Sequence, residues 1–284
     1  MTPPVVLTIA GSDSSGGAGL QADLKTFAAL GVFGASAITA VTAQNTHGVR
    51  GVHPIPATFV LAQIEAVLDD LTVAAVKTGM LATTGIVRAV ADLAAAGRLP
   101  RLVIDPVMVS SSGDRLLQPQ AEALYVEALL PHATVVTPNL REAEAMLTRP
   151  IRTLAEQHEA AHALAQLSTG LVVVKGGHTV TDAGNEAVDV VADGSCTYEL
   201  RAPRVTTRNN HGTGCTFAAA TAAALAQGRD VHEALHDAKS YVHRAITGGA
   251  GWRLGGGHGP LDHLGWSANS PQTTRSAEED DISS

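Results

Sequence analysis

A regular alternation of short apolar runs and helical patterns constrains the fold of this chain more than any other feature. The apolar runs end in small or polar residues, as buried parallel strands do. They cover residues 5–11, 35–41, 74–80, 101–108, 133–139 and 171–177, and helical patterns cover 20–30, 57–71, 84–96, 118–130 and 154–167. This order predicts right-handed βαβ units and therefore an α/β fold with a mostly parallel central sheet flanked by helices.

The last third of the chain departs from this alternation. AVDVVADG and CTYELRAPRV, joined through Asp193-Gly194-Ser195, predict a hairpin at the edge of the sheet. Two helices are expected after it, over residues 213–227 and 231–247. We find no internal repeat and no linker before residue 267, so residues 1–266 are expected to form one domain. The acidic segment 267–284 has few apolar residues to bury and is expected to be disordered.

Composition and charge exclude several classes of protein. Hydrophobic residues make up 45% of the chain and aromatic residues only 3%, which favours helices on a buried sheet over a β-sandwich. The formal charge of -8, without a cluster of Lys or Arg, argues against nucleic acid as a partner. The N-terminus has no basic region and only a short apolar run, so we expect neither a signal peptide nor a membrane span. We therefore expect a cytoplasmic protein in which Cys196 and Cys215 form no structural disulfide.

The chemically interesting residues follow the predicted strands. Ligands of open α/β sheets bind outside the carboxyl ends of the strands, so one cleft is expected to contain them all. These residues are Gly11 to Gly19, Gln44, Met80, Asp105, Asn139 and Lys175.

The turn in NNHGTGCTFAAA leads directly into an alanine-rich helix. Gly212 and Gly214 let the backbone approach a bound group, Thr213 adds a hydroxyl, and the helix start offers unpaired N–H groups, which together predict an anion site. A plain helix cap is the alternative. Cys215 at this helix start is either a thiolate with a lowered pKa, paired with His211, or a small buried residue.

Carboxylates at the predicted sheet edge indicate a metal. Asp105 ends one strand, and Asn139 ends the next with Glu142 in the first turn of the following helix. Oxygen ligands of this kind suit Mg²⁺ bound to nucleotide phosphates, with Lys175 as a point charge for a phosphate. Capping roles for Asp105 and Glu142 are the alternative.

Two other motif readings are weaker. The glycine-rich segment after the first strand lacks the acidic residue that a dinucleotide site needs at the end of the second strand, so it is interpreted as the floor of a pocket for a small uncharged substrate. Asp23 and Gln44 are the expected hydrogen-bond partners in that pocket. His232 and His236 match a zinc-hydrolase spacing, but with Lys239 and His243 they fall on the polar face of their helix, which is expected to face solvent.

Eight motifs together resemble one family. In chain order they are AGSDSSGGAGLQADLKTF, TAVTAQNTHGV, VKTGML, VIDPVMVSSSG, TPNLREAEAML, VVVKGGH, NNHGTGCTFAAA and GGGHGPLDH. This series, between residues 5 and 264, resembles the hydroxymethylpyrimidine/phosphomethylpyrimidine kinases of thiamine biosynthesis, in the ribokinase superfamily. The resemblance implies a single ribokinase-like domain, a three-layer sandwich.

The resemblance also implies a reaction. ATP would phosphorylate the hydroxymethyl group of 4-amino-5-hydroxymethyl-2-methylpyrimidine, and the product would be phosphorylated again at the same site. Most sugar kinases of the superfamily have an aspartate base where this chain has Cys215. A related pyridoxal kinase and a non-enzymatic sensor remain as alternatives, and a homodimer is expected. The implied roles are Gln44, Asp23, Gly11, Met80 and Val107 for the pyrimidine, Gly212 to Cys215 for the anion hole and catalysis, Lys175, Asn139 and Thr213 for ATP, and Asp105 and Glu142 for Mg²⁺.

Overall fold

The computed structural model describes residues 2–108, 117, 119–177 and 184–269. In these residues nine strands form one sheet in the order β3-β2-β1-β4-β5-β6-β7-β8-β9. Strands from β2 across to β7 are parallel to their neighbours, whereas β3, β8 and β9 are added in antiparallel fashion. The strands are β1 Val5–Ser12, β2 Phe33–Asn45, β3 Gly48–Pro54, β4 Val73–Thr78, β5 Leu102–Ile104, β6 Val135–Val136, β7 Leu171–Gly176, β8 Glu186–Ala192 and β9 Thr197–Pro203.

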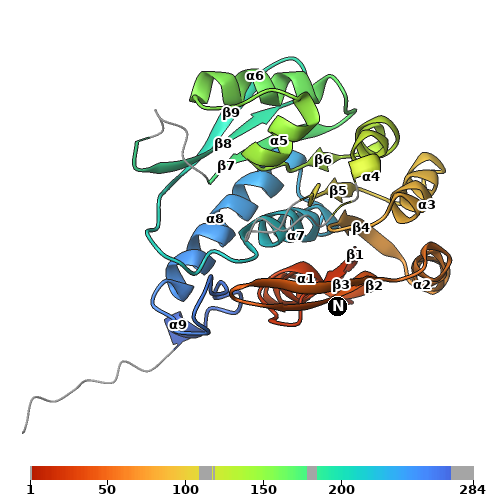
Figure 1. The fold of residues 1–284 in the computed structure, drawn as a ribbon, viewed down its shortest axis with the longest axis horizontal. Helices are drawn as coiled ribbons and strands as arrows, with labels where there is room; N and C mark the ends of the chain where they lie inside the picture. Colours follow the sequence, from red (N-terminus) through yellow and green to blue (C-terminus); the bar gives the residue numbers. More distant parts are fainter. Residues whose placement is uncertain (1, 109–116, 118, 178–183, 270–284) are drawn as a thin grey trace, which may run out of the picture.

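Helices cover both faces of the sheet and complete three layers (Figure 1). One face carries α2 to α6, and the other carries α1, α7 and α8. This arrangement confirms the predicted three-layer α/β fold. The helices are α1 Gly19–Ala29, α2 Ala57–Asp70, α3 Thr84–Ala95, α4 Pro119–Leu124, α5 Leu140–Leu147, α6 Leu154–Ala165, α7 Thr213–Ala226, α8 Val231–Gly249 and α9 Trp266–Asn269.

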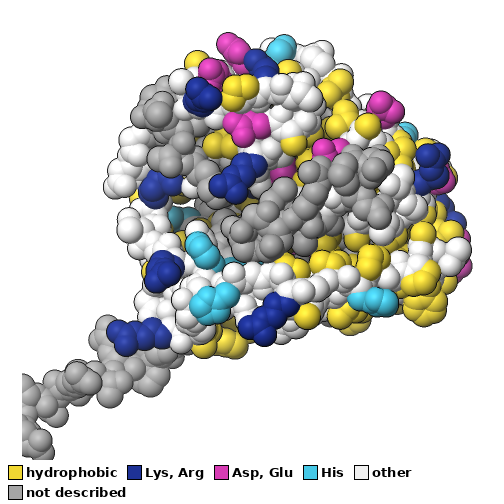
Figure 2. Space-filling view, viewed as in Figure 1, with side chains coloured by type: hydrophobic (Ala, Val, Ile, Leu, Met, Phe, Trp, Pro, Cys, Tyr) yellow, Lys and Arg dark blue, Asp and Glu magenta, His cyan; other side chains and the backbone are white. Residues whose placement is uncertain are grey.

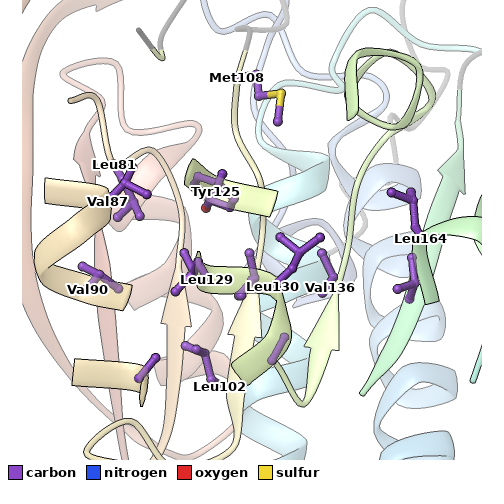
Figure 3. Packing of buried hydrophobic residues seen from close by; sticks show 14 of the residues in the cluster. Leu81, Val87, Val90, Leu102, Met108, Tyr125, Leu129, Leu130, Val136 and Leu164 are labelled. Atoms are coloured by element: carbon purple, nitrogen blue, oxygen red, sulfur yellow. The ribbon is translucent and has the colours of Figure 1, made fainter. Parts of the chain in front are cut away.

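Successive strand residues alternate between the two hydrophobic layers. In β1, Leu7 and Ile9 pack against the α2–α6 layer, whereas Val6 packs against the layer of α1, α7 and α8. Both layers are apolar because helices cover both faces, so the strands appear in the sequence as continuous apolar runs. Figure 3 shows the first layer, in which Tyr125 and Leu129 lie between α3 and the central strands.

The structure adds elements that the sequence did not predict. Strand β3 pairs antiparallel with an extended β2, yet most of its side chains are exposed and it has no buried apolar run. The predicted helix over 118–130 is α4 followed by a π-helical turn, Tyr125–Leu129, and a 3₁₀ turn, Leu130–His132. Pro131 lies in that last turn and lacks the backbone N–H that an α-helix would use.

The boundary of the predicted tail needs a correction. Ser267 belongs to α9, its backbone N–H donates to Asp262 at 2.8 Å, and its hydroxyl donates to the Gly248 carbonyl at 2.8 Å. The Trp252 indole also donates to that hydroxyl at 3.0 Å. These bonds anchor the chain beyond residue 266, and the rest of the predicted tail, residues 270–284, lies outside the described residues.

The order of the strands locates a crevice. The chain passes from β1 to β2 on one side and later returns to β4 on the other side of β1. The carboxyl ends of strands beside such a reversal leave room for a ligand. In the part of the chain that the structure describes, no helix is both long and apolar enough to cross a membrane.

Candidate active site

A cavity of about 560 Å³ opens at the carboxyl ends of the parallel strands. Its size is typical of small-molecule sites. Most of the residues expected in one cleft line it together, whereas Ser14 to Gly17 and Asp23 are not among its lining residues. The lining includes Gly11, Gln44, Met80, Asp105, Val107, Asn139, Glu142, Lys175, Gly212, Thr213, Gly214 and Cys215. Parts of two motifs, residues 109–113 and His178, lie outside the described residues.

The start of α7 forms one wall of the cavity. Gly212 has φ 86°, and a Cβ at this position would lie 1.9 Å from the Gly17 carbonyl oxygen, so only glycine fits. Among the described residues no side chain caps this helix, and the Thr213 N–H donates to the Asn210 carbonyl at 3.3 Å. Gly214 and Cys215, the next residues of the first turn, line the cavity. A Cβ on Gly214 would lie 3.0 Å from Lys175 Nζ. The lysine ammonium and the helix start thus meet at one point, where an anion is favoured.

Asp105, Glu142 and Lys175 form a charged cluster beside this helix start. Lys175 Nζ lies 2.9 Å from Asp105 Oδ1, and Asp105 is buried at the end of β5. Burial raises the pKa of Glu142, Lys175 opposes the rise, Asp105 adds to it, and the resulting pKa is about 8. The cluster therefore holds two carboxyl groups against one lysine.

Glu142 also has the capping role that we considered as an alternative. The Asn139 N–H donates to its carboxylate at 2.8 Å, and the Glu142 N–H donates to Asn139 Oδ1 at 3.0 Å. This capping box explains why α5 starts at the sheet edge. Because Glu142 caps the helix and also lines the cavity beside Asp105, the two roles are compatible.

The structure corrects the role expected for Asp23. Its carboxylate is fully buried on α1, and it lies outside the described residues that line the cavity. Lys77 Nζ contacts both of its oxygens at 3.0 and 2.9 Å, and the Thr8 hydroxyl donates to it at 2.6 Å. Asp23 is thus the buried counter-ion of a lysine and has no direct access to a ligand.

Lys77 is a cavity residue that the sequence did not reveal. It is fully buried on β4 and lines the cavity floor, and a Cβ on Gly79 would lie 2.9 Å from its Nζ. Burial lowers its pKa, but the attraction of Asp23 outweighs this and raises the pKa, so the side chain is charged. The sequence feature that could have identified Lys77 is a lysine inside an otherwise apolar strand. Burial of a charge is unfavourable unless an ion pair or a ligand compensates for it.

Cys215 lies in the first turn of α7 and lines the cavity. Burial raises its pKa to about 12, although the charge of Lys77 acts in the opposite direction. The expectation of a lowered thiol pKa is therefore wrong for the ligand-free protein, in which the thiol is protonated at neutral pH. The helix start lowers a cysteine pKa only when water or a charge also solvates the thiolate.

A second cluster joins the glycine-rich loop to the end of β2. Asp13 Oδ2 lies 2.8 Å from His211 Nε2, which lies 3.3 Å from Gln44 Nε2. Asp13 also accepts backbone N–H bonds from Ser15 and Ala18, both at 2.8 Å. Sequence reasoning included Asp13 only within the segment Gly11 to Gly19 and did not predict its contact with His211, which lies far along the chain. The glycine-rich loop is thus arranged around an aspartate.

The cavity also has an apolar wall. Met80 packs with Ala40, Ala82 and Val107 into a small hydrophobic group. A Cβ on Gly11 would lie 2.1 Å from the methyl group of Met80, so the absence of a side chain at Gly11 leaves room for the methionine. A flat ring with polar edges fits between such a wall and the amide of Gln44.

The far end of the cavity is formed by β8, the loop after β9, and α8. Lys239 Nζ donates to Asp189 at 2.7 Å and to the Ala187 carbonyl at 2.9 Å. Lys239 and His243 line the cavity. The expectation that this part of the polar face of α8 faces bulk solvent is therefore wrong. His232 and His236 are exposed on the same helix, and the Tyr198 hydroxyl lies 2.9 Å from His232 Nδ1.

Comparisons with known proteins agree with this geometry. The family model described as phosphomethylpyrimidine kinase matches residues 13–262. A hydroxymethylpyrimidine/phosphomethylpyrimidine kinase of Rhizobium meliloti is 51% identical over 92% of this chain and 97% of its own length. The corresponding protein of Streptomyces coelicolor is 50% identical over 94% of this chain and 96% of its own length.

The similar solved structures are also kinases of small molecules. A Bacillus subtilis pyridoxal kinase in complex with ADP matches with a TM-score of 0.85 and 38% identity, covering 94% of this chain and all (100%) of the other. A phosphomethylpyrimidine kinase from Clostridium difficile matches with a TM-score of 0.72 and 39% identity, over 84% of this chain and 97% of the other.

Fold and site together define a small-molecule kinase of the ribokinase-like class. Similar solved structures include complexes with ADP and AMP-PCP, which supports ATP as the phosphoryl donor. Within that class, the chain belongs to the phosphomethylpyrimidine kinase family, as the resemblance of its motifs indicated.

Proposed function

We propose that this protein transfers a phosphoryl group from ATP to the hydroxymethyl group of 4-amino-5-hydroxymethyl-2-methylpyrimidine and then phosphorylates the monophosphate to the diphosphate. The observation that carries the proposal is the arrangement of the cavity. The α7 start and Lys175 lie at one point of a cavity that the apolar wall, the Gln44 amide and the Asp105–Glu142 cluster also line. Mass detection of both products tests it.

The residue roles follow from this arrangement. Gln44 binds the polar edge of the ring, and Gly11, Met80 and Val107 enclose its faces. The N–H groups of residues 212–215 and Lys175 stabilise charge on the phosphoryl group in transit, which is most of what a protein contributes to phosphoryl transfer. Asn139 and Thr213 contact the nucleotide phosphates.

Mg²⁺ fits the residues at the sheet edge. Two buried carboxyl groups lie beside one lysine, and burial, together with the charge of Asp105, raises the pKa of Glu142. A divalent cation with oxygen ligands suits such a donor set. Asp105 and Glu142 would hold it, and it would supply neutralisation of phosphate charge.

Cys215 handles the proton of the alcohol in the first transfer. In the ligand-free site the thiol is neutral, so it first loses its own proton to solvent. The charge of Lys77 favours the resulting thiolate, which then accepts the proton of the alcohol. In the second transfer the acceptor is a phosphate oxygen that is already anionic near neutral pH. The second transfer therefore needs no base.

Pyridoxal phosphorylation is a second candidate function, because several similar solved structures are pyridoxal kinases. Parallel assays with ATP and each alcohol separate the two. A preference for pyridoxal would reverse the proposal, whereas pyrimidine-dependent release of ADP would exclude a sensor without turnover.

Assembly and location complete the proposal. Exposed hydrophobic side chains gather on α2, β2 and β3, which is visible along the lower edge of Figure 2. Phe59 is 62% exposed and Phe33 54%, and such a patch favours a homodimer. Sedimentation at twice the chain mass of 29.1 kDa would support it. Two free cysteines suit the reducing cytoplasm, and the catalytic domain extends past residue 266 to Asn269 at the end of α9.

A further inference from the structure

Gln44 contacts two protein groups whose hydrogen-bonding roles are fixed by their own neighbours. Its side-chain nitrogen lies 3.3 Å from His211 Nε2, and its side-chain oxygen lies 3.2 Å from Thr42 Oγ1. Gln44 is half-buried at the end of β2, whereas His211 belongs to the loop before α7. The contact therefore connects the ring pocket with the anion site.

Asp13 fixes the role of His211. Besides His211, its carboxylate accepts the N–H groups of Ala18 at 2.8 Å and Gly17 at 3.2 Å, and the N–H and hydroxyl of Ser15 at 2.8 and 2.7 Å. Burial raises the pKa of Asp13, but the bonds from His211 and Ser15 outweigh it and lower the pKa to about 2. The ionised carboxylate has no hydrogen, so His211 Nε2 is the donor in their 2.8 Å contact.

Thr42 limits the other end of the amide. Its single hydroxyl hydrogen points to the Ser12 carbonyl at 2.8 Å, so Thr42 Oγ1 can only accept from Gln44. If the amide nitrogen of Gln44 faces His211, two N–H donors face each other. The amide oxygen then faces Thr42 Oγ1, and no hydrogen lies between these two oxygens. Exchanging the amide oxygen and nitrogen, which have nearly the same shape, gives Thr42 Oγ1 a donor and lets the amide oxygen share the single Nε2 hydrogen of His211 with Asp13.

We infer that Asp13 and His211 are positioning residues that hold the Gln44 amide with its oxygen toward His211 and its nitrogen toward Thr42. One acceptor and one donor of fixed order then remain for a ligand. This pair is complementary to a ring that carries an exocyclic amine beside a ring nitrogen, as the aminopyrimidine does. The inference rests on the proposed function and adds the source of its selectivity.

His211→Met tests this chain of contacts, because it keeps apolar bulk beside Gly17 but removes the N–H donor. The probes are the hydroxymethylpyrimidine and its analogue without the amine, with binding measured by calorimetry. Wild type is expected to prefer the amine by about tenfold or more, and the variant to lose most of this ratio while its affinity for ATP stays unchanged. His211→Gln, whose amide reaches the same place with two hydrogens, should restore the ratio. His162→Met, exposed on α6, is the matched control.

A second readout does not depend on the ligand. The ¹⁵N spectrum of the wild-type protein should show His211 with hydrogen on Nε2, and a spectrum with Nε2 unprotonated would overturn the inference. An unchanged ratio in His211→Met would also overturn it and assign His211 a purely structural role. Failure of the wild-type protein to bind or phosphorylate the hydroxymethylpyrimidine at all would instead contradict the proposed function.

Discussion

Single residues carry the chemistry of this site through neighbours that are distant in sequence. Lys77 is charged inside the core because Asp23, 54 positions earlier in the chain, accepts from it at 3.0 and 2.9 Å. The charge of Lys77 lowers the pKa of the Cys215 thiol, but burial raises it more, so the thiol is neutral. The function of each group therefore depends on pairings that the fold creates.

Removal of the thiol should affect the two transfers unequally. Cys215→Ala is expected to slow transfer to the alcohol by about 10² or more, as loss of a general base does, and transfer to the monophosphate much less. The thiolate fraction rises as pH approaches the pKa of about 12, so the wild-type first transfer should accelerate from pH 6 to 9 and the variant should not. Rates measured separately on alcohol and monophosphate, with saturating ATP and Mg²⁺, decide this. Equal losses on both would remove Cys215 as the base.

Glu142 should couple magnesium binding to pH. Its pKa is raised from 4.5 to about 8 in the folded protein, so folding takes up a proton between these values and the metal-free protein should lose stability as pH rises through them. Mg²⁺ displaces that proton, and its affinity should rise up to about tenfold per unit until pH 8. Thermal melts with Mg²⁺ titration at pH 6 to 9 measure both effects.

The variants Glu142→Gln and Asp105→Asn should raise the Mg²⁺ requirement of both transfers. Glu156→Gln is a matched control, because Glu156 occupies the same capping-box position on α6 outside the lining of the cavity. An unchanged Mg²⁺ requirement in both cavity variants would show that these residues serve only as caps and ion-pair partners.

At the scale of elements, the N-terminus of α7 brings together segments that are distant in the sequence. Its glycine at 212, the loop containing Gly17 and the lysine of β7 approach within contact distance. A helix start that is uncapped and aimed at a cavity is unfavourable without an anion, so binding of a phosphate compensates for the missing cap.

Gly212→Ala should disable this element. The new Cβ would lie 1.9 Å from the Gly17 carbonyl oxygen at a φ of +86°, so we expect a loss of about 2 kcal/mol or more and little activity. Gly228→Ala, at the other end of α7 with φ +87° and no atom within 4 Å, shares the backbone strain without the overlap. Chemical denaturation and turnover of both variants separate strain from function. Normal turnover in Gly212→Ala would contradict the role of the helix start.

Sequence alone predicted the elements whose burial is simple. The six parallel strands and most helices appear because apolar runs covered by helices on both faces leave a periodic signal. Strand β3 was not predicted, because most of its residues are exposed and the strand forms by pairing with β2. Gln44, Lys175 and Asp105 were placed correctly by the rule of strand ends, whereas the Asp13–His211 and Asp23–Lys77 pairs depend on contacts across the fold that no local pattern encodes.

At the scale of the whole molecule, one sheet carries the complete site, and the chain end is attached beside it. Ser267 and the stacked rings of Trp252 and Trp266, with centroids 6.0 Å apart, fix α9 against the end of α8. The described fold therefore continues into residues 267–269, which the sequence assigned to the tail.

Truncation after Asn269 should leave activity and stability within about twofold and 0.5 kcal/mol of the full chain, because the acidic segment removed has few apolar residues to bury. Truncation after Trp266 removes the three bonds of Ser267 and should lower the melting temperature. Melting curves and turnover of both forms test this. A large loss of activity in the longer form would mean that residues 270–284 contribute to the site or to an interface.

The measurement that tests the proposed function most directly uses the purified full chain with ATP, Mg²⁺ and the hydroxymethylpyrimidine, and mass detection of the products over time. We expect the monophosphate to appear first and the diphosphate to follow, both dependent on ATP, with pyridoxal a poorer acceptor in a parallel reaction. No phosphorylated pyrimidine, or faster phosphorylation of pyridoxal, would contradict the proposed function.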